Sequence, residues 1–205
     1  MHDSPQSTEH FRALLQPLLA VIGLELTESQ LELLDRHYRL LGIWNRRLNL
    51  TSVRDPGGIV RRHFGESLFV AARLQRQTGT LADIGSGAGF PGFPIAVTCA
   101  GLKVALIESV GKKAAFLKEI SRGVGNVTVL AQRFEEVEAY FEWIVVRGVA
   151  LRPLRQHLGR KAKHLAVLTS LGQAEGLGDL LGLQERQVDP IPWDPGSVLL
   201  CGRFT

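Results

Sequence analysis

Two acidic residues and a run of glycines form the part of this sequence best suited to chemistry. Asp83 lies at the end of a β-prone run, and Gly85, Gly87 and Gly89 follow it closely. Glu108 ends the next β-prone run along the chain. Glycines let the backbone turn sharply and approach a ligand, and an acid at the second position commonly binds the two hydroxyls of a ribose. The spacing therefore predicts a nucleoside-cofactor site.

Two cofactor classes fit such a loop, and the charge of Asp83 distinguishes between them. Gly87, Gly89 and Gly92 satisfy the G-x-G-x-x-G dinucleotide pattern, but this match begins beyond the strand end. A carboxylate beside the loop repels a pyrophosphate and favours a ligand with an amino group and no phosphate. The sequence therefore favours S-adenosylmethionine over NAD. A glycine turn that binds no ligand is the structural alternative.

Seven short β-prone runs, which alternate with helical segments from Thr80 onward, must position these residues. The runs are Leu81–Ile84, Lys103–Glu108, Val127–Ala131, Trp143–Val146, Leu165–Thr169, Val188–Ile191 and Val198–Phe204. The helical segments between them include Gly92–Ala100, Lys112–Gly123 and Pro153–Gly159. This alternation predicts an α/β fold with a mostly parallel, seven-stranded sheet covered on both faces. The last strand should run antiparallel, because Pro192–Gly196 is too short for a crossover helix.

The residues before this sheet read as helices. Thr27 and Gln30 form a capping box, and Asp55 followed by Pro56 opens another helix toward Leu74. Pro17 should kink or interrupt the first helix. We expect residues 1–75 to form a helical extension packed on a core of residues 76–205.

Composition restricts the class of protein. A chain of 205 residues, 45% hydrophobic and 21% charged, is about one large globular domain and neither disordered nor collagen-like. Its two cysteines, Cys99 and Cys201, lie in apolar runs, which argues against a disulfide scaffold or a cysteine-based zinc site. No apolar stretch reaches the ~18–20 residues of a membrane span, and Met1–His10 lacks the order of a secretory signal. We expect a cytoplasmic protein.

The net charge of +4 is unevenly distributed. Residues 36–76 hold nine arginines against Asp55 and Glu66, and a second basic cluster runs from Arg147 to Lys163. Such patches suit a polyanion, because released counterions drive phosphate binding. A solvated basic helix face explains them equally well on charge alone.

Several separate motifs resemble those of the bacterial 16S rRNA guanine-N7 methyltransferase family, methyltransferase G, also known as glucose-inhibited division protein B. The resemblance covers most of the chain and rests on Trp44–Pro56, Arg62–Leu68, Asp83–Pro94, Ile107–Leu117, Arg133–Glu136 and Ile144–Arg147. It implies a class I S-adenosylmethionine-dependent methyltransferase, which is a Rossmann-like fold. Glu66 stands where the family usually has aspartate, and Leu171 where it has lysine.

The resemblance also implies roles for individual residues. Asp83 would hold the methionine amino group, with Gly85, Gly87, Gly89 and Phe90 beside the methionine. Glu108 would bind the ribose, and Phe134 and Glu135 would flank the adenine. Arg147 would lie near the cofactor and the acceptor, with Asn45, Asn49 and His63 lining the acceptor pocket. The structural alternatives are a solvated acid for Glu135, an ion pair for Arg147 and a packing role for His63. Trp44 reads as a core residue.

The implied acceptor is guanine N7 in the decoding-centre loop of 16S rRNA, in the small ribosomal subunit. N7 carries a free lone pair at neutral pH, so the transfer needs no general base, and positioning should supply most of the rate. We expect a monomer that uses no metal. The alternatives are an enzyme of the same fold with another acceptor, and a non-catalytic, cofactor-bound RNA-binding module. Asp83 disfavours a nicotinamide oxidoreductase.

Overall fold

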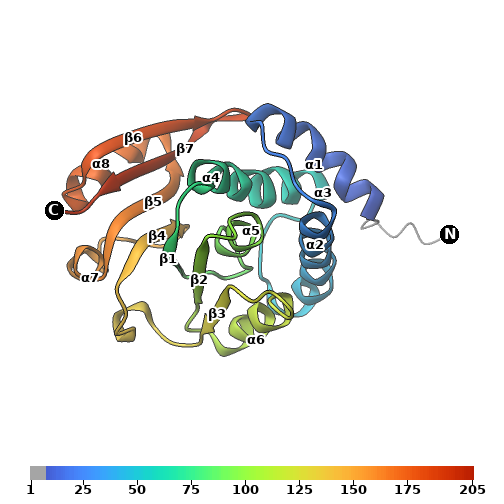
Figure 1. Ribbon diagram of the computed structural model, residues 1–205, viewed down its shortest axis with the longest axis horizontal. Coiled ribbons are helices and arrows are strands. Elements are labelled where there is room, and N and C mark those ends of the chain that lie inside the picture. Colours follow the sequence, from blue (N-terminus) through green and yellow to red (C-terminus); the bar gives the residue numbers. More distant parts are fainter. Residues whose placement is uncertain (1–7) are drawn as a thin grey trace.

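A seven-stranded sheet forms the centre of the computed structural model, which describes residues 8–205 (Figure 1). The strands follow the order β3-β2-β1-β4-β5-β7-β6 across the sheet. Their bounds are β1 Gly79–Ile84, β2 Leu102–Ile107, β3 Val127–Leu130, β4 Phe141–Arg147, β5 Ala162–Ser170, β6 Gln184–Ile191 and β7 Asp194–Arg203. All seven runs predicted from the sequence are strands. The first seven residues of the polar stretch Met1–His10 lie outside the described part.

The strand directions place β1 at the point where the chain order reverses. β1 pairs in parallel with both β2 and β4, and Asp83 lies between Leu106 and Val145 in the register. β5 continues the parallel set beside β4, and β7 runs antiparallel to both β5 and β6. The predicted antiparallel last strand is therefore confirmed. Ligands of such sheets bind at the carboxyl ends of the strands beside the switch point.

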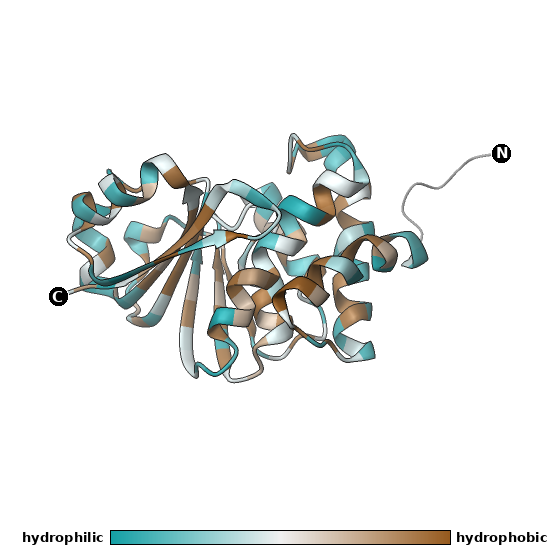
Figure 2. Cartoon of the chain, turned by 90° about the horizontal axis from the view of Figure 1, so that it is seen from above, coloured by the Kyte–Doolittle hydropathy of each residue, from teal (hydrophilic) through white to brown (hydrophobic). Residues whose placement is uncertain are grey.

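Helices cover both faces of the sheet, and alternate strand residues face the two layers. Leu81 and Leu106 pack into one core cluster, whereas Ala82 and Ile107 pack into the other. The helices that follow β1 are α5 Gly92–Thr98, α6 Gly111–Ile120, α7 Arg155–Lys161 and α8 Leu171–Leu181. Figure 2 shows the hydrophobic residues gathered on the strands and on the helical segments beside them. The sequence analysis did not predict α8.

Within residues 8–205, four helices and one π-helical segment precede the sheet. Their bounds are α1 Thr8–Ile22, α2 Glu28–Leu48, α3 Pro56–Ile59, η1 Val60–Gly65 and α4 Glu66–Leu74. The predicted helix from Pro56 toward Leu74 is correct in extent, but the π-helical turn η1 occupies its middle. The predicted interruption of the first helix at Pro17 is wrong, because α1 continues through this residue, and a kink there stays a prediction.

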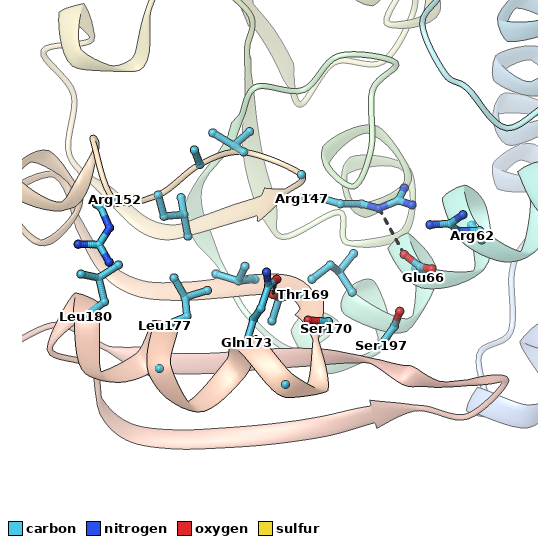
Figure 3. A pocket seen from close by; sticks show the side chains of 18 residues that line it. Arg62, Glu66, Arg147, Arg152, Thr169, Ser170, Gln173, Leu177, Leu180 and Ser197 are labelled. Carbon is cyan, nitrogen blue, oxygen red and sulfur yellow. Dashed lines mark hydrogen bonds and ion pairs between the residues drawn. The ribbon is translucent and has the colours of Figure 1, made fainter.

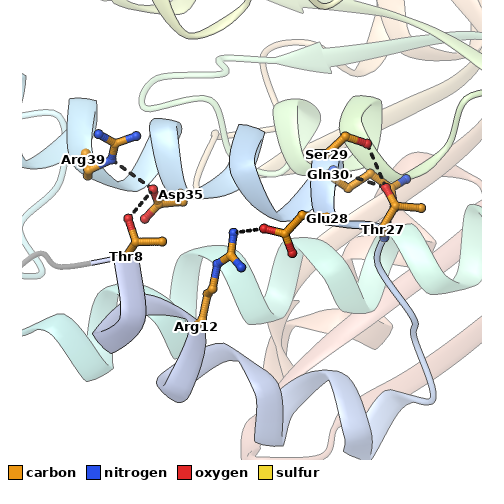
Figure 4. Close-up of polar contacts among 8 residues, drawn as sticks. All are labelled: Thr8, Arg12, Thr27, Glu28, Ser29, Gln30, Asp35 and Arg39. Atoms are coloured by element: carbon orange, nitrogen blue, oxygen red, sulfur yellow. Dashed lines mark hydrogen bonds and ion pairs between the residues drawn. The ribbon is translucent and has the colours of Figure 1, made fainter.

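Polar contacts and stacked rings hold α1 against α2. The capping box of Thr27 and Gln30 is confirmed at the start of α2 (Figure 4). Buried Asp35 accepts a hydrogen bond from Thr8 Oγ1 at 2.9 Å. Phe11 stacks on Tyr38 with 4.8 Å between ring centroids.

The helices of residues 8–205 include none that is long and apolar enough to cross a membrane. The same residues contain no group of three or more His, Cys, Asp or Glu side chains that could hold a metal ion.

The hydroxyl of Tyr38 yields a stability prediction. It is buried and has no hydrogen-bond partner within residues 8–205. A buried donor without a partner loses its hydration and gains nothing in return. We expect Tyr38→Phe to raise the free energy of unfolding by about 1 kcal/mol, whereas Phe11→Ala should lower it by about 3–5 kcal/mol. Urea denaturation followed by circular dichroism measures both. A loss of stability in Tyr38→Phe would contradict the assignment.

Candidate functional site

The glycine loop leaves β1 at its carboxyl end and turns through left-handed backbone. The φ angles of Gly85, Gly87 and Gly89 are 67°, 53° and 88°, a region that side chains rarely permit. The amides of Gly85 and Ser86 both donate to the carbonyl of Ile107, at 2.9 and 3.1 Å. A Cβ on Gly85 would lie 2.6 Å from Val149 Cγ2. The loop is therefore fixed to β2. Its glycines are required because the backbone is left-handed at all three positions and a side chain at Gly85 would clash with Val149.

Asp83 lies fully buried beneath this loop. Its Oδ2 accepts a hydrogen bond from the Gly92 amide at 3.0 Å, which ties the start of α5 to the end of β1. Burial raises the pKa of Asp83 to about 7. Its Oδ1 is buried and has no partner within residues 8–205. The cavities described below are lined by other residues, so the contact of Asp83 with an amino group stays a prediction.

Glu108 joins the glycine loop to the second strand. Its Oε2 accepts from the Gly87 amide at 3.0 Å, and its Oε1 accepts from the Val110 amide at 2.8 Å. Glu108 also lines a cavity of about 220 Å³, the small cavity, together with Gly85, Phe134 and exposed Glu135. Each carboxylate oxygen accepts more than one hydrogen bond, so Glu108 can hold the loop and still bind a hydroxyl group.

Lys161 supports the far wall of the small cavity, and the sequence analysis missed it. Its ammonium donates to the carbonyls of Phe134, Glu135 and Val137 at 3.2, 2.8 and 2.6 Å. It also lies 5.3 Å from the centroid of the Phe134 ring. Because one cation binds three carbonyls, the turn that carries Phe134 and Glu135 is fixed.

Phe90 stacks with two imidazole rings. The ring centroid of His37, from α2, lies 4.6 Å from that of Phe90 at 23°, and that of His63, from η1, lies 5.0 Å away at 20°. His37 Nε2 lies 2.7 Å from the carbonyl oxygen of Ala88, so it must be the donor. Complete burial lowers the pKa of His37 to about 3. Helix α2 therefore contacts the glycine loop through neutral His37, which donates to Ala88 and stacks with Phe90.

A chain of hydrogen bonds leads from Arg147 back to α2. Arg147 Nη1 lies 2.7 Å from His63 Nδ1, and His63 Nε2 lies 2.6 Å from Thr51 Oγ1. A guanidinium only donates, so Nδ1 accepts and the proton of His63 must sit on Nε2. Asn45 then holds both the amide and the carbonyl of Thr51. The geometry fixes the tautomer of His63 within the protein.

Charge and burial keep His63 neutral. Burial, followed by the nearby charges of Arg147 and Arg62, lowers the pKa of His63 to about 3. Arg147 also pairs with Glu66, with 3.3 Å between Nε and Oε2. Since both nitrogens of the His63 ring are engaged, His63 orients Arg147 and is unable to act as a general base. The predicted proximity of His63 and Arg147 is present, and so is the ion pair weighed as the alternative role of Arg147.

Two larger cavities open around Arg147. The middle cavity, about 400 Å³, is lined by Thr51, His63, Gly85, Phe90 and Arg147 among others. The large cavity, about 870 Å³, lies against the ends of β4 and β5 and against α8 (Figure 3). Arg62, Arg147 and Gly148 line both of these cavities.

The small cavity adjoins both of the others. It shares Gly85 with the middle cavity, and it shares Val149 and Ala150 with the large one. The three cavities therefore meet around the segment 147–150 at the end of β4. One elongated ligand can fill the small and middle cavities while a second molecule approaches through the large cavity.

Four predicted site residues line none of the three cavities: Asn45, Asn49, Asp83 and Gly89. Of these, Asn49 lies at the surface. It ends α2 in the left-handed conformation, with φ of 47°, and its exposed side chain accepts from Arg54 at 3.2 Å. Sequence reasoning also missed His37, and it treated Glu66 only as a variant position. His37 falls within the apolar stripe of α2, where its spacing resembles that of a core residue.

The fold and the cavities define a class I methyltransferase, and comparisons agree. A methyltransferase from Aquifex aeolicus, described as S-adenosylmethionine-dependent, superimposes with a TM-score of 0.62 at 16% identity, covering 77% of this chain and 97% of that one. At this identity the likeness shows the fold alone. The family model for rRNA small subunit methyltransferase G matches residues 30–166.

Two curated relatives carry the name ribosomal RNA small subunit methyltransferase G. The protein of Stenotrophomonas maltophilia is 36% identical over 188 residues, which are 87% of each chain. That of a Roseiflexus species is 48% identical over 117 residues, 56% of this chain and half of that protein. The chain belongs to the ribosomal RNA small subunit methyltransferase G family, as its sequence motifs predicted.

The buried histidine of the loop gives a pH prediction. Folded His37 stays neutral down to about pH 3, whereas an unfolded histidine gains a proton below about pH 6.5. In this window the unfolded chain binds the additional proton, so the contribution of His37 to stability falls as the pH falls. We expect His37→Gln to reduce the pH dependence of the unfolding free energy by up to about 1.4 kcal/mol per pH unit.

Urea titrations of both proteins between about pH 4 and pH 6 measure this difference. Equal slopes in the two proteins would show that His37 titrates alike when folded and unfolded, and would contradict its neutral, buried state.

Proposed function

We propose that this protein transfers a methyl group from S-adenosylmethionine to N7 of a guanine in the decoding-centre loop of 16S rRNA. The observation that carries the proposal is the meeting of three cavities around residues 147–150. A donor in the small and middle cavities and a base in the large cavity would share these walls. Membership of the methyltransferase G family supports the choice of a ribosomal RNA acceptor.

The residues around the two smaller cavities fit the proposed cofactor. Glu108 faces the small cavity with acceptor oxygens suited to the ribose hydroxyls, and the fixed turn of Phe134 and Glu135 suits the adenine. The glycine loop would pass beside the methionine portion. Within residues 8–205, one oxygen of Asp83 is buried without a hydrogen-bond partner, which suits the amino group of the cofactor. When bound, the cofactor supplies a methyl group on a positively charged sulfur.

The site around Arg147 fits an acceptor that needs no deprotonation. Guanine N7 has a free lone pair, and His63 is fixed as a neutral donor to Thr51 and acceptor from Arg147. The protein would therefore act by positioning, with Arg147 held rigid by His63 and Glu66 to orient the base or a neighbouring phosphate. Held in this way, the guanidinium loses little conformational entropy on binding.

Exposed basic side chains in the segments 46–62 and 152–163 suit the RNA backbone. They are Arg46, Arg47, Arg54, Arg61 and Arg62 before the sheet and Arg152, Arg155, Arg160 and Lys163 after β4, and of these Arg62 and Arg152 line the large cavity. Within the described residues, none of these forms an ion pair with a carboxylate. Their charges are therefore available to phosphates, which favours RNA binding over a merely solvated face.

A methyl-transfer assay tests the proposed function. Small subunits from cells that lack this protein are incubated with it and labelled S-adenosylmethionine, and mass spectrometry locates the methyl group. We expect one 7-methylguanosine in the decoding-centre loop. Label on a different base would support another acceptor. Cofactor binding and RNA binding without transfer would support a non-catalytic module.

Glu108→Ala tests the proposed cofactor site by its effect on the affinity for S-adenosylmethionine. It removes the acceptor for the ribose and frees the Gly87 amide, so we expect at least a roughly tenfold loss of cofactor affinity in calorimetry. Glu138→Ala, which removes an exposed acid elsewhere, should leave that affinity unchanged. Equal affinity in wild type and Glu108→Ala would overturn the placement of the ribose.

A further inference from the structure

Glu66 is a buried carboxylate that faces the large cavity. It lies at the start of α4, is 5% exposed and lines the cavity together with Arg62 and Arg147 (Figure 3). Within residues 8–205 its ionic partner is Arg147, through Oε2. In the described part of the chain the structure gives Oε1 no hydrogen-bond or ionic partner, so the carboxylate keeps acceptor capacity.

The rest of the cavity lining suits a planar base. Apolar walls come from Val149, Leu151, Val167, Leu168, Leu177 and Leu180. Uncharged polar groups come from Thr169, Ser170, Gln173 and Ser197. Among the lining residues Glu66 is the one acid, beside Arg62, Arg147 and Arg152. A cavity that combines apolar walls with hydrogen-bonding side chains is the usual environment of a base taken out of its stack.

The acceptor atom alone is unable to select guanine. Adenine also presents an unprotonated N7, so a methyltransferase specific for guanine must read another edge of the base. Guanine carries two donors side by side, N1–H and the 2-amino group, which match the two oxygens of a carboxylate. Adenine places an acceptor at N1, which a carboxylate repels. A buried carboxylate in the acceptor cavity is therefore a group that can distinguish the two purines.

We propose that Glu66 determines specificity by accepting hydrogen bonds from N1–H and the 2-amino group of the target guanine. This inference rests on the proposed function and adds the recognition of the base to it. Arg147 holds the carboxylate in place through Oε2, and in return Glu66 fixes the guanidinium. The same negative charge offsets the positive charge that the base gains when N7 is methylated.

The test compares two acceptors that differ in one amino group. Small subunits are reconstituted with ligated 16S rRNA that carries guanosine or inosine at the target position. Inosine keeps N7, O6 and N1–H but lacks the 2-amino group. The ratio of kcat/KM for the two substrates is measured for wild type, Glu66→Gln, Glu66→Ala and Glu66→Asp. Cofactor affinity is measured by calorimetry as a check on folding.

We expect the wild type to prefer guanosine by roughly 10-fold or more, because inosine leaves a charged acceptor partly unpaired. Glu66→Asp keeps a carboxylate and should keep the preference. Glu66→Ala should reduce it to near unity, with Glu66→Gln between. If a variant is too slow to assay, its binding to the guanosine-containing and inosine-containing small subunits is measured in the presence of S-adenosylhomocysteine. The ratio of the two dissociation constants then replaces the ratio of kcat/KM.

A preference in Glu66→Ala equal to that of wild type would overturn the proposal, and would leave Glu66 as the ion-pair partner of Arg147. Equal use of guanosine and inosine by wild type would overturn it too. Absence of transfer by the wild type to guanosine would instead refute the proposed function, so the two failures are distinguishable.

Discussion

The stacking of Phe90 with two uncharged imidazoles is the contact on which the site depends. His37 and His63 come from the helices before the sheet, whereas Phe90 belongs to the glycine loop after β1. Burial keeps His37 neutral although its ring donates to a carbonyl, whereas His63 is neutral by geometry as well as burial, since it must accept from a guanidinium. The shape of the loop is thus set from outside the sheet.

His63 extends this constraint to the acceptor side. It contacts Phe90 with its face and Arg147 with its edge, so one ring orients both the loop and the guanidinium. Arg147 in turn pairs with Glu66 in the large cavity. Groups suited to donor and acceptor are therefore connected through a few rigid contacts, which is the arrangement that a reaction governed by positioning requires.

The sequence predicted the features that depend on local pattern. Alternating apolar runs located all seven strands, and the short link before Ser197 set the direction of the last one. Helix α8 was missed because Leu171–Leu181 holds three glycines that weaken helix propensity. The π-helical turn and the pairing of Arg147 with His63 and Glu66 depend on contacts between distant segments, which no local pattern records. For the same reason, Asn49 was placed in the pocket, although it ends a helix at the surface.

Calorimetric titration with S-adenosylmethionine, applied to wild type and Phe90→Ala, tests most directly whether the doubly stacked loop is the cofactor cradle. We expect wild type to bind one equivalent. The variant, whose loop has lost the ring that stacks with His37 and His63, should bind more than roughly tenfold more weakly while remaining folded. Equal affinities in the two proteins would contradict this role of the loop.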